Sequence, residues 1–455
     1  MASQQTRPAR GMRDFLPEDV RRREYVIGVV SDVYRRYGFE PLETPALENI
    51  ETLTGKYGDE GNKLIFKVLR RGEHESSGET DLALRYDLTV PLARVVAEYR
   101  GKLPRFFKRY QIQPVWRADR PARGRFREFY QCDVDSIGST SPVVEAEILG
   151  AVGDVLLALG FRDFVVRLNH REALAALLTN ALVAAEHQGA ALVALDKLDK
   201  IGPDGVAREL SERGVEPASI DRLTNWIGAG FRPDWLDWLE RELTLLDDRG
   251  RAAFQNVREI LVLAEQTPAR GHLRFEPALA RGLSYYTGAI MEITVPDLAR
   301  SLGGGGRYDG LVGMFSGDNV PACGFSLGLE RILVVMGERQ MFPASVQQAS
   351  ADVLVALFDS GLVPQALSLA GELRGAGVRV DVYPDVDKLG KQMKYAASRS
   401  IPFAAILGTD EIAKAEVTVK NLQTGEQQAL PRGEVARWIH QSRAMNNGQR
   451  TTGSG

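Results

Sequence analysis

Hydrophobic and polar positions follow different patterns in three successive regions of the chain, and each pattern predicts its own kind of structure. In the first region a helix is predicted over residues 16–37, ended by Gly38. Its apolar positions have the spacing of one buried helical face: Val26, Val29, Val30, Val33 and Tyr34. Residues 39–47 are predicted to be extended because they contain two prolines. Residues 105–137 have the pattern of a long β-hairpin.

The middle region, residues 171–265, has helical patterns with many charged residues and almost no β-branched alternation. We therefore predict an inserted helical module. Strand patterning returns after residue 272, and residues 321–337 predict a strand that leads into a helix. Segments 1–170 and 266–340 are expected to form one domain that the helical residues interrupt.

The last region alternates strands with helices. Strands are predicted at 352–357, 378–382, 403–407 and 416–422, and helices at 363–374, 388–398 and 433–441. This alternation predicts a parallel α/β sheet in a further domain over residues 350–442. The polar residues 443–455 are predicted to form a disordered tail.

The composition is that of an ordinary soluble protein, since 44% of the 455 residues are hydrophobic and 26% are charged. The 57 Lys and Arg against 60 Asp and Glu give a formal net charge of -3, so any basic surface for nucleic acid must be local. Two cysteines outside any CxxC pair and five scattered histidines predict neither disulfides nor a zinc site. No apolar run approaches the ~18 residues of a membrane span. We expect a cytoplasmic protein without a membrane partner.

Common nucleotide-binding and hydrolase motifs do not explain the glycine-rich segments. No Gly-Lys pair is followed by Ser or Thr, which excludes a Walker A loop. The four glycines at 303–306 do not fit GxGxxG, and they predict either a tight turn or a backbone that approaches a ligand too closely for a Cβ. Residues 324–328 fit the GxSxG of serine hydrolases, but His440 is the only later histidine, so the hydrolase order of residues is missing.

The hairpin carries the most informative chemistry, because residues 101–128 contain nine Lys or Arg and only two acidic residues. Period-2 geometry on its second strand places one polar set on the same face: Arg125, Arg127, Phe129, Gln131, Asp133 and Asp135. Such a face is costly to bury unless a ligand or partner satisfies it. It predicts a site for a polyanion beside an amine or imidazole, with a solvated hairpin face as the alternative.

Seven segments resemble, in the right order, the motifs of class II aminoacyl-tRNA synthetases and, among these, of the histidyl-tRNA synthetase family. They are Arg-Gly-Met-Arg-Asp-Phe-Leu-Pro at 10–17, the helix and Pro45 strand of motif 1, Leu-Arg-Tyr-Asp-Leu-Thr-Val-Pro at 84–91, motif 2 at 115–133, Arg-Gly-Leu-Ser-Tyr-Tyr at 281–286, Gly-Gly-Gly-Arg-Tyr-Asp-Gly-Leu at 304–311, and motif 3 at 324–331. The resemblance implies an α+β fold: a class II catalytic domain with an antiparallel sheet and helices, a helical insertion, and a C-terminal α/β anticodon-binding domain.

The same resemblance implies an enzyme that activates L-histidine with ATP and Mg²⁺ and transfers it to tRNA(His), acting as a homodimer. Because a carboxylate attacks a phosphate, cationic side chains must offset the repulsion. Arg117 and Arg281 are implied as catalytic residues, and Arg117, Arg125 and Arg331 as ATP-binding residues. No metal ligand is assigned.

Histidine binding is implied for a larger set: Asp87, Leu88, Thr89, Arg117, Gln131, Asp135, Arg281, Tyr285 and Tyr286. Three of these are expected to hold the α-ammonium: Asp87, Thr89 and Gln131. Asp135 and Tyr286, with Tyr285 adjacent, are expected to address the ring nitrogens. A site that bonds both nitrogens can reject apolar isosteres by ~10⁴–10⁵.

Two residues depart from the family pattern. Ser284 stands where the family usually has Asp, and Asp119 replaces a common Glu. Two alternative functions follow from the same resemblance: a non-catalytic paralogue that acts as a regulatory subunit or histidine sensor, and a ligase that passes histidine to a small-molecule amine. Pyrophosphate exchange would distinguish the first alternative, and tRNA charging the second.

Overall fold

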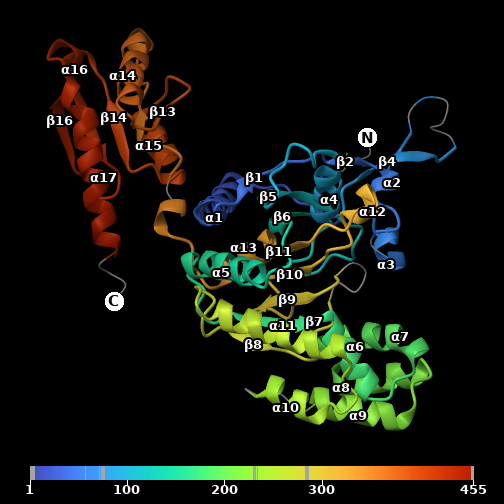
Figure 1. Cartoon of the computed structure of the whole chain (residues 1–455). Helices are drawn as coiled ribbons and strands as arrows, with labels where there is room; N and C mark the ends of the chain where they lie inside the picture. Colours follow the sequence, from blue (N-terminus) through green and yellow to red (C-terminus); the bar gives the residue numbers. More distant parts are fainter. Residues whose placement is uncertain are drawn as a thin grey trace. The chain divides into compact units, whose positions relative to one another are not determined.

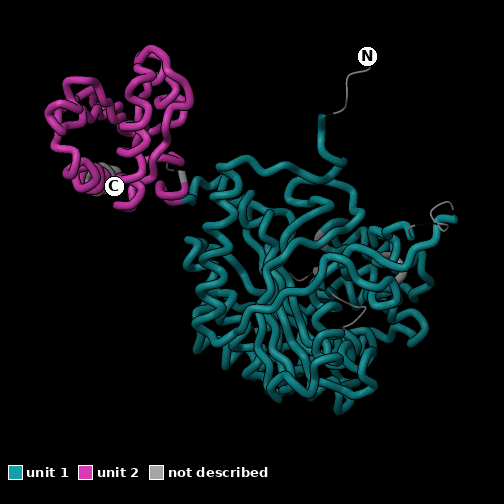
Figure 2. Tube along the Cα trace, turned by 90° about the horizontal axis from the view of Figure 1, so that it is seen from above, with its two compact units in different colours: residues 1–342 teal, residues 343–455 magenta. Residues whose placement is uncertain are grey.

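The computed structural model describes residues 6–451 apart from 57, 71, 73–76, 229–231, 233, 282–285 and 348. Figure 2 shows the chain as two compact units, Met1–Phe342 and Pro343–Gly455. All seven segments that resemble synthetase motifs fall in the first unit, so the candidate chemistry is concentrated there.

The first unit is built on an eight-stranded sheet with the order β1-β5-β6-β11-β10-β9-β7-β8 (Figure 1). Its strands are β1 (Glu40–Pro41), β5 (Phe107–Trp116), β6 (Glu128–Ile137), β7 (Val165–His170), β8 (Leu273–Phe275), β9 (Ala289–Thr294), β10 (Gly303–Arg307) and β11 (Ala322–Gly328). The two edge pairs, β1–β5 and β7–β8, are parallel, and the pairs between them are antiparallel.

The predicted hairpin is confirmed as β5 and β6, but its second strand begins at Glu128 and not at residue 125. The turn takes up the earlier residues, because Ala122 pairs with Arg125 and Gly124 has a positive φ of 66°. Arg125 and Arg127 therefore precede the strand, and its alternation does not fix the direction of their side chains.

Strand register sorts the side chains of the large sheet onto two faces. One row of Cα partners crosses the sheet through Gln111, Asp133, Ser326, Gly304 and Glu292. The adjacent positions along the same strands point to the other face, where apolar residues such as Val134 and Phe325 are buried. One face is thus an ordinary hydrophobic core, and the other is polar.

Four helices pack against the apolar face. They are α1 (Pro17–Arg36), α5 (Val143–Ala158), α11 (Asp248–Ala264) and α13 (Leu329–Glu338). Helix α1 confirms the helix predicted over residues 16–37, and its inward positions Val26 and Val30 are fully buried. Complete burial of one such side chain contributes about 1.5–3 kcal/mol, so the helical cover holds the sheet rigid from one side.

The glycine run at residues 303–306 forms strand β10 in the middle of the sheet, so the tight-turn prediction is wrong. A Cβ on Gly305 would lie 2.2 Å from the carbonyl oxygen of Gly324, and one on Gly306 would lie 2.5 Å from that of Ala289. Close approach of the neighbouring strands therefore requires glycine here. Glycine composition by itself could not distinguish this arrangement from a turn.

The first unit also contains a smaller three-stranded sheet, ordered β2-β4-β3. Its elements are β2 (Leu47–Asn49), β3 (Lys67–Leu69) and β4 (Thr80–Leu84), with helices α2 (Ile50–Leu53), α3 (Gly58–Lys63), α4 (Thr89–Glu98) and α12 (Gly313–Ser316). Val90 and Leu92 of α4 share a buried core with Phe107 of β5 and Leu311. This core fixes the segment between β4 and α4 against the large sheet.

The middle region is helical, as the sequence predicts. Besides α11 it contains α6 (Arg171–Asn180), α7 (Ala185–Leu195), α8 (Leu198–Glu212), α9 (Pro217–Gly228) and α10 (Trp235–Glu242). Figure 1 shows α6–α10 gathered beyond β7 and β8. Their core, which includes Leu174 and Leu192, continues to Ala280 and to Ile290 of β9. The boundaries of a separate domain at residues 171 and 265 stay a prediction.

The second unit has a five-stranded sheet, ordered β13-β12-β14-β15-β16. Its elements are β12 (Val353–Val355), α14 (Val363–Gly375), β13 (Val380–Val382), α15 (Leu389–Ser398), β14 (Phe403–Ile406), α16 (Thr409–Ala413), β15 (Glu416–Asn421), β16 (Gln427–Pro431) and α17 (Val435–Thr451). The predicted parallel sheet is correct for three strands, but β15 and β16 are antiparallel. The sequence analysis missed β16, which follows a short turn at Gly425 with a φ of 79°.

The prediction of a disordered tail over residues 443–455 is wrong for its first part, because α17 continues to Thr451. Residues 443–445 are good helix formers and the segment has no proline, whereas the Asn-Asn-Gly at 446–448 has low helix propensity. The Arg443 guanidinium also donates to the buried Asp352 carboxylate at 2.8 Å, which ties the helix to the start of the sheet. Residues 452–455 lie outside the described part of the chain.

Within the described residues, none of the helices combines the length and the apolar composition that crossing a membrane requires.

Candidate active site

A cavity of about 680 Å³ opens on the polar face of the large sheet. Nine of the residues predicted for the site line it: Asp87, Thr89, Arg117, Arg125, Gln131, Asp135, Arg281, Tyr286 and Arg331. They come from the β4–α4 segment, the hairpin, motif 3 and the segment before β9, so the fold joins distant parts of the sequence.

Three other predictions have different outcomes. Leu88 is fully buried and is not part of the cavity wall; its carbonyl oxygen accepts a hydrogen bond from Arg109 Nη2 at 3.3 Å. Tyr285 and Ser284 lie outside the described residues. Arg127 was placed on the polar face by strand alternation, but its Nε donates to the Asp119 carbonyl oxygen at 3.1 Å and it does not line the cavity.

Arginines are concentrated at one end of the cavity: Arg117, Arg125, Arg281, Arg300 and Arg331. Arg125 pairs with Asp119, and Arg281 Nη2 lies 3.0 Å from Glu292 Oε1. Arg281 Nε also lies 3.6 Å from Asp196 Oδ1. Arg331 and Arg117 have neutral partners: Arg331 donates to the Ser301 carbonyl oxygen, and Arg117 donates to the Tyr86 carbonyl oxygen at 3.0 Å and to Gln131 Oε1 at 3.4 Å. Positive charge therefore exceeds what these partners neutralise, which is typical of a site for an anion.

The pKa of Arg331 reflects the crowding of the arginines. Burial, followed by the charges of the neighbouring arginines, lowers the pKa of its guanidinium to about 10. Burial and the charge of Arg125 also lower the pKa of Arg300. A bound polyanion would remove the repulsion, so the cluster is suited to a phosphate chain.

Carboxylates gather at the other end of the cavity, around one buried cation. Asp135 Oδ2 lies 2.9 Å from Arg109 Nη2, and its other oxygen accepts a hydrogen bond from the Tyr308 hydroxyl. Asp133 lies 3.9 Å from the same guanidinium. Burial raises the pKa of both carboxyls, that of Asp133 to about 7, against the opposing effect of Arg109. Two carboxylates share one cation, which leaves this end suited to a cationic or proton-donating ligand.

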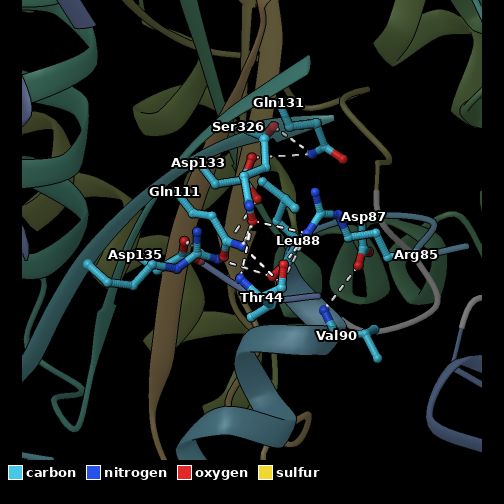
Figure 3. A network of polar contacts seen from close by, with 12 residues as sticks. Thr44, Arg85, Asp87, Leu88, Val90, Gln111, Gln131, Asp133, Asp135 and Ser326 are labelled. Carbon is cyan, nitrogen blue, oxygen red and sulfur yellow. Dashed lines mark hydrogen bonds and ion pairs between the residues drawn. The ribbon is translucent and has the colours of Figure 1, made fainter. Parts of the chain in front are cut away.

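Asp87 is held at the start of helix α4, where its Oδ1 accepts a hydrogen bond from Val90 N at 3.0 Å. This contact satisfies a backbone group at the helix N-terminus and places Thr89, the first helical residue, at the cavity. Figure 3 shows the layer next to it, in which Arg85 Nη1 donates to the Thr44 carbonyl at 2.6 Å and Gln111 Nε2 donates to Thr44 Oγ1 at 3.0 Å. These bonds tie the β4–α4 segment to β5.

Ser326, the serine of the GxSxG match, is not a hydrolase nucleophile. It lies inside strand β11 and not at a strand-to-helix elbow. Its Oγ accepts a hydrogen bond from Gln131 Nε2 at 2.7 Å, and no histidine is among the described residues that line the cavity.

Several polar residues of the site were not predicted from the sequence, among them Arg109, Arg300, Glu292, Tyr308 and Asp196. Arg109 was detectable, because the hairpin register puts it opposite Asp135 on the polar face. Arg300 and Glu292 lie outside the motif segments, and only the sheet order brings Glu292 into the same row as Asp133.

An antiparallel sheet with helices on one face and an arginine-lined cavity on the other defines the catalytic domain of a class II aminoacyl-tRNA synthetase. A family model described as histidyl-tRNA synthetase matches residues 11–332, and one described as anticodon binding domain matches residues 352–442. The chain belongs to the histidyl-tRNA synthetase family.

Individual relatives agree with this. A histidine–tRNA ligase of Gloeobacter violaceus is 42% identical over 449 residues, covering 92% of this chain and 95% of the relative. One of Cytophaga hutchinsonii is 40% identical and covers 94% and 97%. The solved structure of histidyl-tRNA synthetase from Nostoc sp. PCC 7120 has a TM-score of 0.79 at 30% identity, covering 96% of this chain and all of the other. An ATP phosphoribosyltransferase regulatory subunit/histidyl-tRNA synthetase from Bacillus halodurans C, 21% identical with a TM-score of 0.71 and coverage of 89% and 99%, shares the fold.

The crowding of the arginines predicts that removing Arg331 has little effect on the free energy of unfolding but a large effect on anion binding. Arg331→Met should change the free energy of unfolding by no more than about 1 kcal/mol, because the variant relieves repulsion while it loses one contact. Stabilisation by inorganic pyrophosphate, measured by urea unfolding, should nevertheless fall sharply.

Arg307→Met is the matched control, because Arg307 is also buried but is paired with Glu145 at 2.6 Å. Its loss should cost about 3–5 kcal/mol, since Glu145 would remain buried without its cation. An equally large loss of stability in Arg331→Met would contradict the assignment of Arg331 to an anion site.

Proposed function

We propose that this protein is a histidine–tRNA ligase that forms histidyl-adenylate from L-histidine and ATP and transfers the histidyl group to tRNA(His). The observation that carries the proposal is the polarity of this cavity, with clustered arginines at one end and the Asp133–Arg109–Asp135 group at the other. Family membership and the curated relatives support the activity and ATP as its substrate. We expect the protein to act in the cytoplasm.

At the arginine end, the histidine carboxylate oxygen attacks the α-phosphorus of ATP and pyrophosphate leaves. Arg117 and Arg281 bind the carboxylate and the α-phosphate and stabilise the charge that develops between them. Arg281 is suited to this because the carboxylates of Asp196 and of Glu292, which is 2% exposed, hold its guanidinium in the cavity wall. Arg125 and Arg331 bind the rest of the phosphate chain.

At the acidic end, Asp87, Thr89 and Gln131 bind the α-ammonium, while Asp135 and Tyr286 bind the imidazole nitrogens. Asp135 is suited to bind a ring nitrogen, because its contacts with Arg109 and Tyr308 fix the orientation of its carboxylate. A neutral imidazole can donate from one nitrogen and accept at the other, so two fixed partners distinguish it from apolar rings. Tyr285 remains part of the proposed histidine site by resemblance alone, as does Leu88.

Mg²⁺ would neutralise phosphate charge during the reaction. Among the described residues there is no group of three or more His, Cys, Asp or Glu able to hold a metal ion, and the cavity carboxylates Asp119 and Glu292 are paired with arginines. The described side chains therefore do not form a metal cage of their own. Mg²⁺ commonly binds through substrate phosphates and water, and we propose that mode here.

The alternatives have weaker support. A regulatory paralogue has no need of the arginine cluster or of an anticodon-binding domain, and this chain has both. No structural feature favours a small-molecule amine as the acceptor. Histidine-dependent pyrophosphate exchange without tRNA charging would favour that acceptor, and the absence of exchange would favour a regulatory role.

Arg281→Ala tests the chemistry, because Arg281 acts on charge that develops during adenylate formation. We expect histidine-dependent pyrophosphate exchange to fall at least ~10²-fold, a loss of about 3 kcal/mol or more. The control is Arg270→Ala, since Arg270 is exposed and lies outside the cavity. Thermal unfolding of both variants checks the fold, because Glu292 loses a partner in Arg281→Ala. A near-normal exchange rate in Arg281→Ala would refute its catalytic role.

We also propose that two copies of the chain associate through the motif 1 helix α1 and the segment around Pro45. Large apolar residues next to these elements are exposed in the single chain, Leu16 by 68% and Leu47 by 42%. A twofold dimer through these elements would cover the same residues on both copies. Light scattering at micromolar concentration should give about twice the mass of one chain, and a fully active monomer would contradict the proposal.

The second unit is proposed to bind the anticodon region of the tRNA, as the matched domain model suggests. Deletion of residues 345–455 should leave histidine-dependent pyrophosphate exchange largely intact and raise KM for tRNA, because the cavity belongs to the first unit. Residues 351–455 contain 12 Lys or Arg and 11 acidic residues, so binding should depend on shape and unstacked bases more than on net charge. Equal charging by both proteins at limiting tRNA would refute this role.

A further inference from the structure

The carboxamide of Gln131 has hydrogen-bonding partners on both of its ends. Its Nε2 donates to Ser326 Oγ at 2.7 Å and to Asp133 Oδ1 at 3.2 Å. Its Oε1 lies 3.4 Å from Arg117 Nη2, which donates to it. Figure 3 shows Ser326 and Asp133 converging on the same nitrogen.

These partners permit only one orientation of the amide. A carboxamide has two N–H donors on one end and a single acceptor oxygen on the other, and both donors are used by Ser326 and Asp133. A 180° rotation would bring Oε1 against the Asp133 carboxylate and Nε2 against the Arg117 guanidinium. Both encounters would be repulsive, so the oxygen is fixed on the side that faces the cavity.

The sheet geometry explains why Ser326 is the nearer partner. Gln131 and Asp133 lie two residues apart on β6, so both point to the polar face. On β11, Ser326 is the Cα partner of Asp133, and Gly328, which has no side chain, is the partner of Gln131. The Gln131 side chain can therefore lean across the space above Gly328 toward the Ser326 hydroxyl. The Ser326 hydroxyl also acts to lower the pKa of the Asp133 carboxyl, against the larger raising effect of burial.

We infer that Ser326, supported by Asp133, is a positioning residue that holds the Gln131 oxygen toward the α-ammonium of the amino acid substrate. The inference rests on the proposed function, which assigns Gln131 to that ammonium, and it adds the reason for the orientation. Asp133 and Arg117 oppose the reversed carboxamide, and the Ser326 hydroxyl adds the shortest of the three contacts that hold the productive orientation. Ser326 would act on binding and would take no part in the attack on ATP.

Ser326→Ala is the test variant, because it removes the hydroxyl with little change in volume. In pyrophosphate exchange, KM for L-histidine should rise about 3- to 10-fold, as expected for the loss of one net hydrogen bond. kcat and KM for ATP should stay within about 2-fold, since uniform binding is lost and not transition-state stabilisation. Ser136→Ala is the matched control, because Ser136 lies on β6, the strand of Gln131, and is buried but does not line the cavity.

Two inhibitors separate the ammonium from the rest of the ligand. L-histidinol keeps the ammonium and lacks the carboxylate, whereas imidazolepropionate keeps the carboxylate and lacks the ammonium. Ser326→Ala should weaken inhibition by L-histidinol by the same factor as it raises KM for histidine, and should leave inhibition by imidazolepropionate unchanged. Equal weakening of both inhibitors would overturn the inference, because it would indicate a general disturbance of the cavity.

A double-mutant cycle with Gln131→Ala tests whether Ser326 acts through Gln131. In the Gln131→Ala background, Ser326→Ala should have no further effect on L-histidinol inhibition. Additive effects would show a direct role of Ser326 and would overturn the inference. Failure of the unmodified protein to catalyse histidine-dependent exchange would instead refute the proposed function, so the two failures are distinguishable.

Discussion

Mutual repulsion of the arginines in the cavity is the constraint on which the catalytic unit depends. Long side chains with like charges would separate into solvent unless other groups held them. Arg281 pairs with Asp196 at the end of α7. The other partners are Glu292 for Arg281, Asp119 for Arg125, and the Ser301 carbonyl for Arg331. These partners lie on the sheet or in the segments joined to it, so the sheet maintains the unfavourable cluster. The work of assembling positive charge is done during folding and need not be repeated when the phosphates bind.

Burial of side chains on the apolar face of the sheet offsets the free-energy cost of clustering the arginines on the other face. Helices α1, α5, α11 and α13 bury valines, leucines and phenylalanines against that face, and this burial stabilises the strands that carry the charged residues. The two faces of one sheet thus have separate tasks. The covered face supplies stability, and the open face holds side chains that would be costly in a core.

Separation of charge along the cavity also favours one orientation of a bound amino acid. Carboxylates at one end share only Arg109, while arginines dominate the other end. A zwitterionic amino acid has its ammonium and carboxylate on the same carbon, so only one orientation places each group near its opposite charge. In the proposed function, the basic side chain then extends toward Asp135. Recognition of the ring and alignment of the attacking carboxylate would therefore follow from the same gradient of charge.

Much of this could be predicted from the sequence, and the exceptions have physical causes. Helix α1, the hairpin and the helical middle region follow from periodicities within one segment. Strand β10 did not, because its glycines are required by neighbouring strands that only the tertiary fold supplies. The same limit applied to Glu292, whose place beside Arg281 depends on sheet order. Arg109 could have been found, because the register of a single predicted hairpin already pairs it with Asp135.

The glycines of the polar face show how the cavity is made. Gly304, Gly306, Gly324 and Gly328 lie on this face of β10 and β11, and none has a positive φ, so backbone flexibility does not explain them. Lack of space explains them, because a Cβ on Gly324 would lie 1.9 Å from Asp135 Oδ1 and would occupy the position of that carboxylate. The missing side chains create room for the charged groups of the adjacent strands. Of the two interpretations of the glycine run, the one based on close approach was nearer the truth, although the approaching groups include the protein's own strands and side chains.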